Sequence, residues 1–527
     1  MNKAAWIVVV WLWAWLPAPA PAQPGPYESG EKLTGERAID ALVLHRLEEL
    51  KIPPAAVCSD GVFLRRAYLD VIGTLPTAKE AREFLQDKAP NKRALLIDRL
   101  LERDEFADYW AMKWANLLRV KAEFPINLWP NAAQAYSRWI RTAVKANKPY
   151  DQFARELLTG GGSNFYAPEV NFYRAVQGRG PDVLAQAVAL TFMGERAGKW
   201  PKDRLAGLAG FFAQVGYKAT AQWKEEIVYW DPSIDIAKAT SRPAGAGPVF
   251  PDGTPAVIPA GRDPREVFAD WLVSPKNPGF APVMANRVWS WLLGRGIVNE
   301  PDDFRPDNPP ANPELLALLS REFVAARYDV KSLFRLILNS RTYQLSPLPP
   351  SRRPEAAANF AYYPLRPLEA EVLIDALDQI TGTSEKYTSA IPEPFTFIPE
   401  SMRAIALPDG SITSTFLDLF GRPPRDSGLE SERTTRVSAA QRLHMLNSSH
   451  VQKKIERSWQ IMKLGQLRTN TPAAVGEIYL TVLSRFPTAE ELKALGPYIQ
   501  QPTRKVNEAG QDLIWSLINS DEFLYRH

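Results

Sequence analysis

The sequence predicts a mainly α-helical protein with two helical modules, joined by a Pro/Gly-rich irregular segment that contains at most short β-hairpins. Apolar residues recur at helical spacing through most of the chain. The 46 prolines among 527 residues are scattered between the periodic segments, where they mark loops and helix starts. Hydrophobic residues make up 45% and charged residues 23%, a balance typical of globular proteins with sizeable cores.

The first 22 residues are typical of a secretory leader. Lys3 supplies a positive start, an apolar run covers residues 4–16, and Ala20-Pro21-Ala22 fits the small-x-small cleavage pattern. The run is shorter than the roughly 20 residues needed to span a bilayer. We therefore expect residues 1–22 to be a signal peptide and the mature protein to be periplasmic or secreted, without a membrane segment. An uncleaved leader kept as an anchor is the alternative.

An N-terminal helical module is expected over residues 36–230. Its first helix is predicted near residues 39–50, where five apolar side chains share one helical face, and Pro53-Pro54 ends it. Further helices are predicted over residues 62–72, from residue 77, and over 92–101, 109–118, 136–144, 182–193 and 205–215.

Residues 231–262 are predicted to link the modules, because prolines and glycines crowd this stretch. The short alternating run at residues 256–258 suggests a small hairpin within it. A C-terminal helical module is then expected over residues 263–527. Its helices are predicted over residues 264–273, 282–293, 313–326, 331–339 and 368–381, and again from residue 438 to the end, after a Pro- and Gly-punctuated stretch at 387–429.

One segment is echoed late in the chain. Residues 68–80 match residues 479–491, and each copy is followed by a second helix and then by Asp-Glu-Phe. In both copies a threonine, Thr77 or Thr488, precedes a glutamate by three residues, which is the pattern of a helix-capping box. The echo predicts a helix-turn-helix unit that is used twice.

The composition argues against several function classes. The net charge of +4 comes from interleaved acidic and basic residues, so the basic stripe of a nucleic-acid-binding protein is missing. Among four histidines and one cysteine, none pairs with a second His or Cys at ligand spacing, so no metal site is predicted. Cys58 cannot form an internal disulfide and is expected to be a small, partly buried side chain near a helix start. No Gly-x-Ser-x-Gly nucleophile motif is present.

Four acidic residues lie close together after residue 299, at Glu300, Asp302, Asp303 and Asp307. Their oxygens could bind calcium, but the regular spacing of a calcium loop is missing. A solvated loop that pairs with Arg305 is the favoured interpretation.

Polar residues inside apolar helices and loops are the candidates for a functional site. A functional interpretation places them along a cleft between the modules. The structural interpretation, which we favour, makes them buried ion pairs and caps that link helices. The candidates are Arg65, Arg66, Asp70, Asn286, Arg287, Asp303, Arg366, Glu369, Arg422 and Asn447.

Several of these residues stand in motifs that resemble a known family. The segments at residues 65–77, 286–289, 294–298, 366–371 and 443–448 are similar to those of secreted planctomycete-type proteins with paired domains of unknown function 1549 and 1553. The resemblance covers nearly all of the chain after the leader. It implies an exported helical protein with two domains, but no settled activity.

The chain departs from this family at two places. Many relatives carry a Cys-x-x-Cys-His element after a Phe-Leu-Gly-like stretch, whereas Phe192-Met193-Gly194 is followed here by residues 195–200 without cysteine. Relatives also tend to have cysteines near the segment that corresponds to residues 428–433, which has none here. Covalent heme attachment requires two thiols and an axial ligand, so we expect no heme at this element, and no cofactor.

Three functional hypotheses remain. The family's association with polysaccharide use favours a non-catalytic exported binding or assembly protein, whose partner is a polysaccharide or another secreted protein. The twelve tryptophans after the leader would suit sugar stacking or a core. The first alternative is a carboxylate-dependent hydrolase that acts on glycans in a cleft between the modules. The second is a degenerate relative of electron-transfer proteins without heme.

Overall fold

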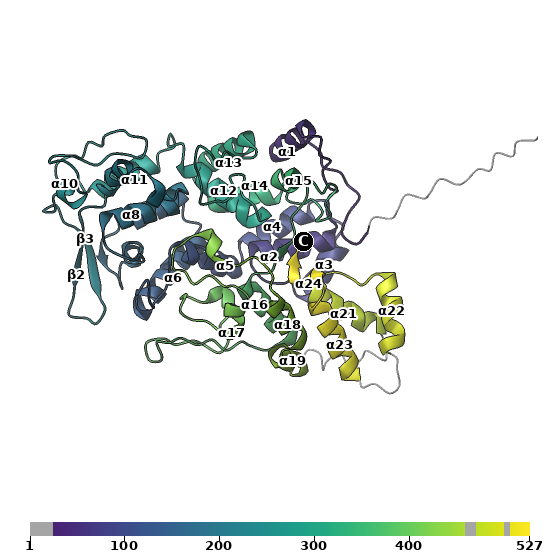
Figure 1. Ribbon diagram of the computed structural model, residues 1–527. Coiled ribbons are helices and arrows are strands. Elements are labelled where there is room, and N and C mark those ends of the chain that lie inside the picture. The colour runs from purple at the N-terminus through teal and green to yellow at the C-terminus, as the bar shows by residue number, and fades with distance from the viewer. Residues whose placement is uncertain (1–24, 459–470, 500–505) are drawn as a thin grey trace, which may run out of the picture.

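A computed structural model describes residues 25–458, 471–499 and 506–527, so the predicted leader lies outside the described residues. The predicted mainly α-helical fold is confirmed, because helices dominate and the strands are few and short (Figure 1). Within the described ranges, no helix has the length and apolar character required to cross a membrane.

Helices of the first half follow the predicted order closely, and the helix α4 has the bounds expected from the sequence. The elements are α1 (Ala38–Glu49), α2 (Asp60–Val71), α3 (Ala78–Gln86), α4 (Lys92–Leu101), α5 (Asp104–Leu117), α6 (Pro130–Lys145), α7 (Tyr150–Thr159), η1 (Pro168–Tyr173), α8 (Pro181–Val188), η2 (Ala189–Met193), η3 (Ala197–Lys199), α9 (Lys202–Ala209) and α10 (Ile236–Ala239).

Helices of the second half lie beside those of the first half, as α13 and α14 lie near α1 and α4 (Figure 1). They are α11 (Pro264–Leu272), α12 (Phe280–Leu293), α13 (Pro313–Ala325), α14 (Val330–Leu338), α15 (Pro354–Ala358), α16 (Ala370–Thr381), η4 (Ala404–Ala406), α17 (Thr415–Leu419), η5 (Glu430–Glu432), α18 (Ala439–Asn447), α19 (Ser449–Glu456), α21 (Thr471–Leu483), α22 (Ala489–Ile499), α23 (Val506–Ile518) and α24 (Asp521–Leu524).

The strands form two small antiparallel sheets. The first has the order β1-β3-β2, from β1 (Gly162–Ser163), β2 (Val215–Ala219) and β3 (Glu226–Trp230). The second pairs β4 (Arg366–Pro367) with β5 (Tyr525–Arg526), and it brings the C-terminal end of the chain to the centre of the molecule (Figure 1).

The hairpin β2–β3 corrects two sequence predictions. The helix predicted over residues 205–215 ends at Ala209, and strand β2 begins at Val215. The predicted linker contains an isolated bridge between Val249 and Pro255, whereas the hairpin itself precedes the linker. Short apolar runs such as Phe211-Phe212 fit helix and strand equally well, so local periodicity could not separate the two.

The two halves share one continuous hydrophobic core. Helix α1 packs on α13, α4 on α14, α7 on α11 and α3 on α21, so elements of both predicted modules alternate in the contacts. Phe106 of α5 and Phe334 of α14 lie 5.6 Å apart between ring centroids, with their planes nearly perpendicular. The division into two modules stays a prediction, since the hydrophobic core is not divided at the predicted boundary.

Both copies of the sequence echo fold in the same way. Thr77 accepts a hydrogen bond from the Glu80 amide, and the Glu80 carboxylate accepts one from the Thr77 amide. Thr488 and Glu491 exchange the same two bonds at the start of α22. These reciprocal bonds satisfy amides that a helix start otherwise leaves unpaired.

Candidate functional site

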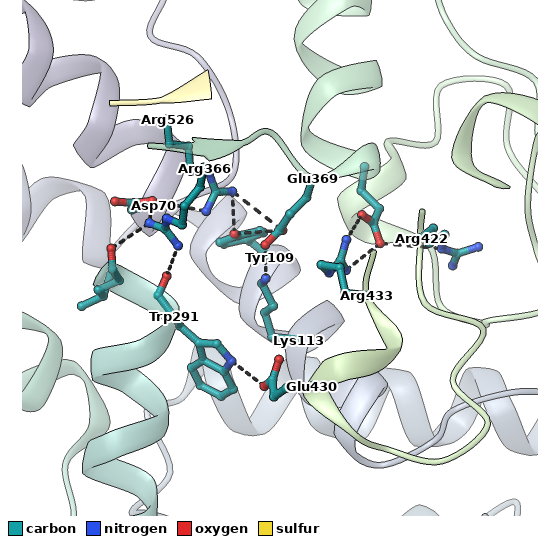
Figure 2. A network of polar contacts seen from close by, with 12 residues as sticks. Asp70, Tyr109, Lys113, Trp291, Arg366, Glu369, Arg422, Glu430, Arg433 and Arg526 are labelled. Carbon is teal, nitrogen blue, oxygen red and sulfur yellow. Dashed lines mark hydrogen bonds and ion pairs between the residues drawn. The ribbon is translucent and has the colours of Figure 1, made fainter. Parts of the chain in front are cut away.

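Asp70 lies at the centre of a buried polar network where the β4–β5 ladder meets helix α2. The ladder register places Arg366 directly opposite Arg526. Two arginines opposite each other repel, so the pairing requires an anion between them. Asp70, in the last turn of α2, supplies this anion from a buried position (Figure 2).

Asp70 receives four polar contacts. Its Oδ1 lies 3.1 Å from Arg366 Nη2 and 3.2 Å from Arg526 Nη1. Its Oδ2 accepts hydrogen bonds from the hydroxyls of Tyr343 at 3.0 Å and Tyr363 at 2.7 Å. Both carboxylate oxygens are therefore saturated, and no lone pair is left for a proton transfer.

Glu369 forms the second anionic centre of the network (Figure 2). It pairs with Lys113 of α5, accepts a hydrogen bond from the Tyr109 hydroxyl at 3.2 Å, and lies 3.7 Å from Arg526. Burial alone would raise the pKa of Glu369, but the nearby cations, Lys113 foremost, outweigh it and hold the pKa well below its usual range. Glu369 therefore stays ionised at neutral pH.

The network continues through Arg433 (Figure 2), which binds Glu371 in the first turn of α16. Arg433 donates to both oxygens of Glu371, at 2.7 and 3.0 Å, and Arg422 lies 3.8 Å from the same carboxylate. Burial opposes ionisation of Glu371, yet the two arginines keep its pKa lowered. This two-bond geometry is the strongest form of an ion pair between arginine and a carboxylate.

A second branch runs from Arg366 through Trp291 to Glu430 (Figure 2). Arg366 donates to the Trp291 carbonyl at 2.9 Å, and the Trp291 indole donates to Glu430 at 2.6 Å. Asp302 accepts from the Glu430 amide at 2.7 Å and from Arg287 at 3.1 Å. Burial and the charge of Asp302 raise the pKa of Glu430.

Other candidate arginines bind backbone carbonyls in the interior. Arg65 donates to the carbonyls of Val482 and Phe523, and Arg66 donates to those of Tyr343, Leu345 and His527. Each of these bonds satisfies a carbonyl that would otherwise be buried without a partner. These arginines therefore tie the C-terminal segment to α2 and have a structural role.

Hydrogen bonds to backbone groups are also made by the side chains of Arg287, Arg422 and Asn286. Arg287 binds the Thr191 carbonyl at 2.8 Å as well as Asp302, and Arg422 binds the carbonyls of Ile412 and Asp409. The side-chain amide of Asn286 exchanges two hydrogen bonds with Val298 and fixes the loop after α12.

Two candidates lie outside this interior. Asp303 pairs with Arg305 at 3.0 Å, and so does Asp307 at 3.2 Å. The predicted solvated loop is wrong for Asp302, which is buried against Arg287, and Glu300 pairs with Arg196 instead of Arg305. Asn447 is exposed at the end of α18. The structure thus brings Asp70, Arg366 and Glu369 into one network and leaves Asp303 and Asn447 apart from it.

One pair of histidines escaped the sequence analysis. Nε2 of His444 lies 3.4 Å from Nδ1 of His450, and Nε2 of His450 lies 2.8 Å from Glu385. The turn at Ser448 between α18 and α19 brings together residues six apart, a spacing that no regular ligand pattern covers. In the part of the chain that the structure describes, no three His, Cys, Asp or Glu side chains are arranged to hold a metal.

A surface cluster of aromatic side chains, here called the aromatic platform, also went unnoticed in the sequence. It is formed by Trp129, Trp223 and Phe395, which lie in three loops, and we count the exposed Phe124 and Phe397 with it because they stand in the same loops as Trp129 and Phe395. The Trp129 and Phe395 rings lie 5.3 Å apart, and the Lys224 ammonium lies 5.5 and 5.3 Å from the rings of Trp129 and Trp223. The exposed fractions of Phe124, Trp223 and Phe397 are 79%, 70% and 67%, which is high for aromatic residues.

Hydrogen bonds hold two of these loops together. Asp409 accepts from the Ala122 amide at 2.9 Å, and Ser411 accepts from the Glu123 amide at 3.0 Å. The Glu123 carboxylate in turn accepts from the Ala390 amide at 3.2 Å. The loop that carries Phe124 and Trp129 is therefore anchored to its neighbours.

The family comparison agrees with the motifs. Residues 38–196 match the family PSCyt2, described as a protein of unknown function (DUF1549). Residues 264–499 match the family PSD1, described as a protein of unknown function (DUF1553). No curated protein and no solved structure matches the chain. The two matches, which follow each other along one chain, support its membership of the proteins that pair a PSCyt2 domain with a PSD1 domain.

Proposed function

We propose that this chain is a non-catalytic exported binding protein that holds a polysaccharide on its aromatic platform. The observation that carries the proposal is the gathering of exposed rings from three loops at one surface, where Trp129, Trp223 and Phe395 share contacts. Flat aromatic faces suit the apolar faces of sugar rings, and large exposed aromatic clusters mark interaction sites. Anchored loops also reduce the ordering entropy that binding costs.

The polar network supports a structural role for the interior. The side chains of Asp70 and Glu371 are 0% exposed, and that of Glu369 is 13% exposed. Each of these carboxylates faces at least two cations or hydroxyl donors. A buried network in which these three carboxylates are paired stabilises one arrangement of helices.

Affinity electrophoresis tests the proposal. Wild type, Trp223→Ala and Phe397→Ala run through gels that contain one of a panel of neutral and acidic polysaccharides. We expect at least one polysaccharide to retard the wild type, and each variant to lose most of that retardation. Trp515→Ala is the matched control, because Trp515 is a partly exposed tryptophan on α23 and is not part of the platform. Equal retardation of all four proteins, or of none by any polysaccharide, contradicts the proposal.

A hydrolase is the second candidate, and Glu430 is the observation that favours it. Its raised pKa and the neighbouring carboxyl group of Asp302 are features of a general acid in a two-carboxylate site. The same polysaccharides, incubated with wild type and Glu430→Gln, separate the two functions. Release of soluble sugars that Glu430→Gln abolishes would establish the hydrolase and overturn the binding proposal.

A further inference from the structure

An open pocket of about 350 Å³ lies at the start of the loop that follows α5 and carries Phe124 and Trp129. The residues of the polar network do not line it. Its apolar floor is made by Val183, Ala187 and Leu190. Three of its lining side chains are basic, namely Arg119, Arg196 and Lys199. The volume is at the lower end of the range for small-molecule sites, about 300–1,000 Å³, and is sufficient for one monosaccharide unit.

Arg119 is the unusual residue of this pocket. It is 3% exposed, and its Nε donates to the Ala175 carbonyl at 2.6 Å. Its Nη2 is buried and has no hydrogen-bond partner in the described part of the chain. Burial lowers the pKa of Arg119 to about 10, with small opposing contributions from Tyr136 and Glu432, so the guanidinium is charged at neutral pH. A buried charge with an unpaired donor is costly unless an anion meets it.

The surrounding charges leave a positive surplus. Arg196 pairs with Glu300 at 2.6 Å, and Asp426, an acidic side chain that lines the pocket, pairs with Lys121 at 2.6 Å. Lys199 is exposed and forms no ion pair among the described residues. Among the described residues, Arg119 and Lys199 form no ion pair, although the charge of Glu432 acts on Arg119, so the pocket retains two cations without a directly bound counter-ion.

The backbone at Gly428 lies close to the Arg119 guanidinium on one side of the pocket. Gly428 has φ +76°, and a Cβ at this position would lie 2.7 Å from Arg119 Nη1 and 2.6 Å from the Leu117 carbonyl. Only glycine fits such a left-handed, close approach without strain. Residues 426–429 thus close one side of the pocket against the guanidinium.

We propose that this pocket binds the oxyanion of an acidic sugar unit, with the carboxylate or sulfate on Arg119 and Lys199 and the ring on the apolar floor. Guanidinium groups bind such oxyanions with short, charge-assisted hydrogen bonds. The inference deepens the proposed function, since it names an acidic glycan as the ligand class. The loop from Arg119 to Trp129 connects the pocket with the aromatic platform.

Isothermal titration calorimetry with the full chain tests the pocket. Glucuronate, methyl glucoside, a glucose sulfate ester and inorganic sulfate are titrated separately. We expect one saturable site for glucuronate or the sulfate ester, at least tenfold weaker binding of methyl glucoside, and weaker binding as salt rises. Equal binding of glucuronate and methyl glucoside overturns the proposal. Inorganic sulfate that binds as tightly as either acidic sugar overturns the sugar part and identifies a free anion as the ligand.

Two variants locate the site. Arg119→Met should weaken glucuronate binding at least tenfold, because it removes the buried donor. Lys199→Glu, at an exposed position that leaves the core intact, should weaken it about fivefold. Lys88→Glu is the matched control, because it makes the same charge change at an exposed lysine in the loop after α3, which does not line the pocket. Unchanged affinity in Lys199→Glu, or an equal loss in Lys88→Glu, contradicts the assignment.

The two proposals fail separately. If glucuronate binding depends on Lys199 while Trp223→Ala retains every polysaccharide, the platform proposal is wrong and the pocket stands. If a neutral polysaccharide depends on Trp223 while no acidic sugar binds, the pocket is wrong and the platform stands.

Discussion

Replacing Asp70 with asparagine tests the structural role of the network most sharply. Asp70→Asn keeps the size of the side chain but removes the charge that Arg366 and Arg526 share, at 3.1 and 3.2 Å. The substitution also replaces one carboxylate oxygen by an NH2 group, which cannot accept a hydrogen bond. Either the two arginines or the two tyrosine hydroxyls then lose their acceptor. Breaking a buried pair leaves an uncompensated charge, which costs about 3–5 kcal/mol. We therefore expect the free energy of unfolding to fall by about that amount.

Urea denaturation at pH 7, followed by tryptophan fluorescence, measures the change. Asp98→Asn is the matched control, because Asp98 pairs with Arg335 at 2.6 Å but both side chains are about half exposed, at 51% and 41%. Exposed pairs contribute roughly 0–1 kcal/mol, so this variant should shift the curve little. If Asp70→Asn costs no more than Asp98→Asn, the network does not stabilise the fold and the reasoning is wrong.

Three further predictions concern local features. Thr77→Ala removes the cap of α3 and should lower the free energy of unfolding by about 1 kcal/mol in the same urea assay; an unchanged value would show that Glu80 caps the helix alone. Gly294→Ala should cost about 2–4 kcal/mol, because φ is +75° and a Cβ would lie 2.2 Å from Arg366 Cδ; a midpoint equal to wild type would contradict this. Burial raises the pKa of Asp375 to about 6, so the folded chain keeps a proton that the unfolded chain releases between about pH 4 and 6. The stabilisation from this group is present below that window and is lost as pH rises through it, by up to about 3 kcal/mol. Asp375→Asn should therefore make the thermal midpoint less dependent on pH over this range. An unaltered pH dependence in the variant would exclude the group.

Helices with a local signal could be predicted from the sequence. Helix α4 was predicted with both bounds, and the capping boxes at Thr77 and Thr488 form as expected. Cys58 is buried one residue before Ser59, the N-cap of α2, in agreement with its predicted place near a helix start. These features depend on neighbouring residues, which is why a single sequence contains them.

Features that depend on distant pairing could not be predicted. Asp70, Arg366 and Glu369 were candidates because they are polar residues in apolar segments, but their partner Arg526 was missed. Arg526 reaches Asp70 only through the β4–β5 ladder, whose two strands are too short to leave a periodic pattern. Lys113 was missed because a lysine on a helix is usually a solvated surface residue.

The platform was missed for a related reason. Its rings come from three loops, and a lone aromatic residue in a loop gives no sequence signal. Their contacts depend on the hairpin turn at Lys224, which lies in a segment where the sequence did not predict strands.

We infer that the ligand binds at the surface and that the interior network stabilises the fold. The affinity of the folded Asp70→Asn protein for the polysaccharide that retards the wild type tests this claim most directly, at a temperature well below the variant's unfolding midpoint. We predict an affinity within about twofold of wild type, while Trp223→Ala loses most of its affinity at the same temperature. A folded Asp70→Asn protein that no longer binds, beside a Trp223→Ala protein that still does, would place the functional site in the network and contradict the account.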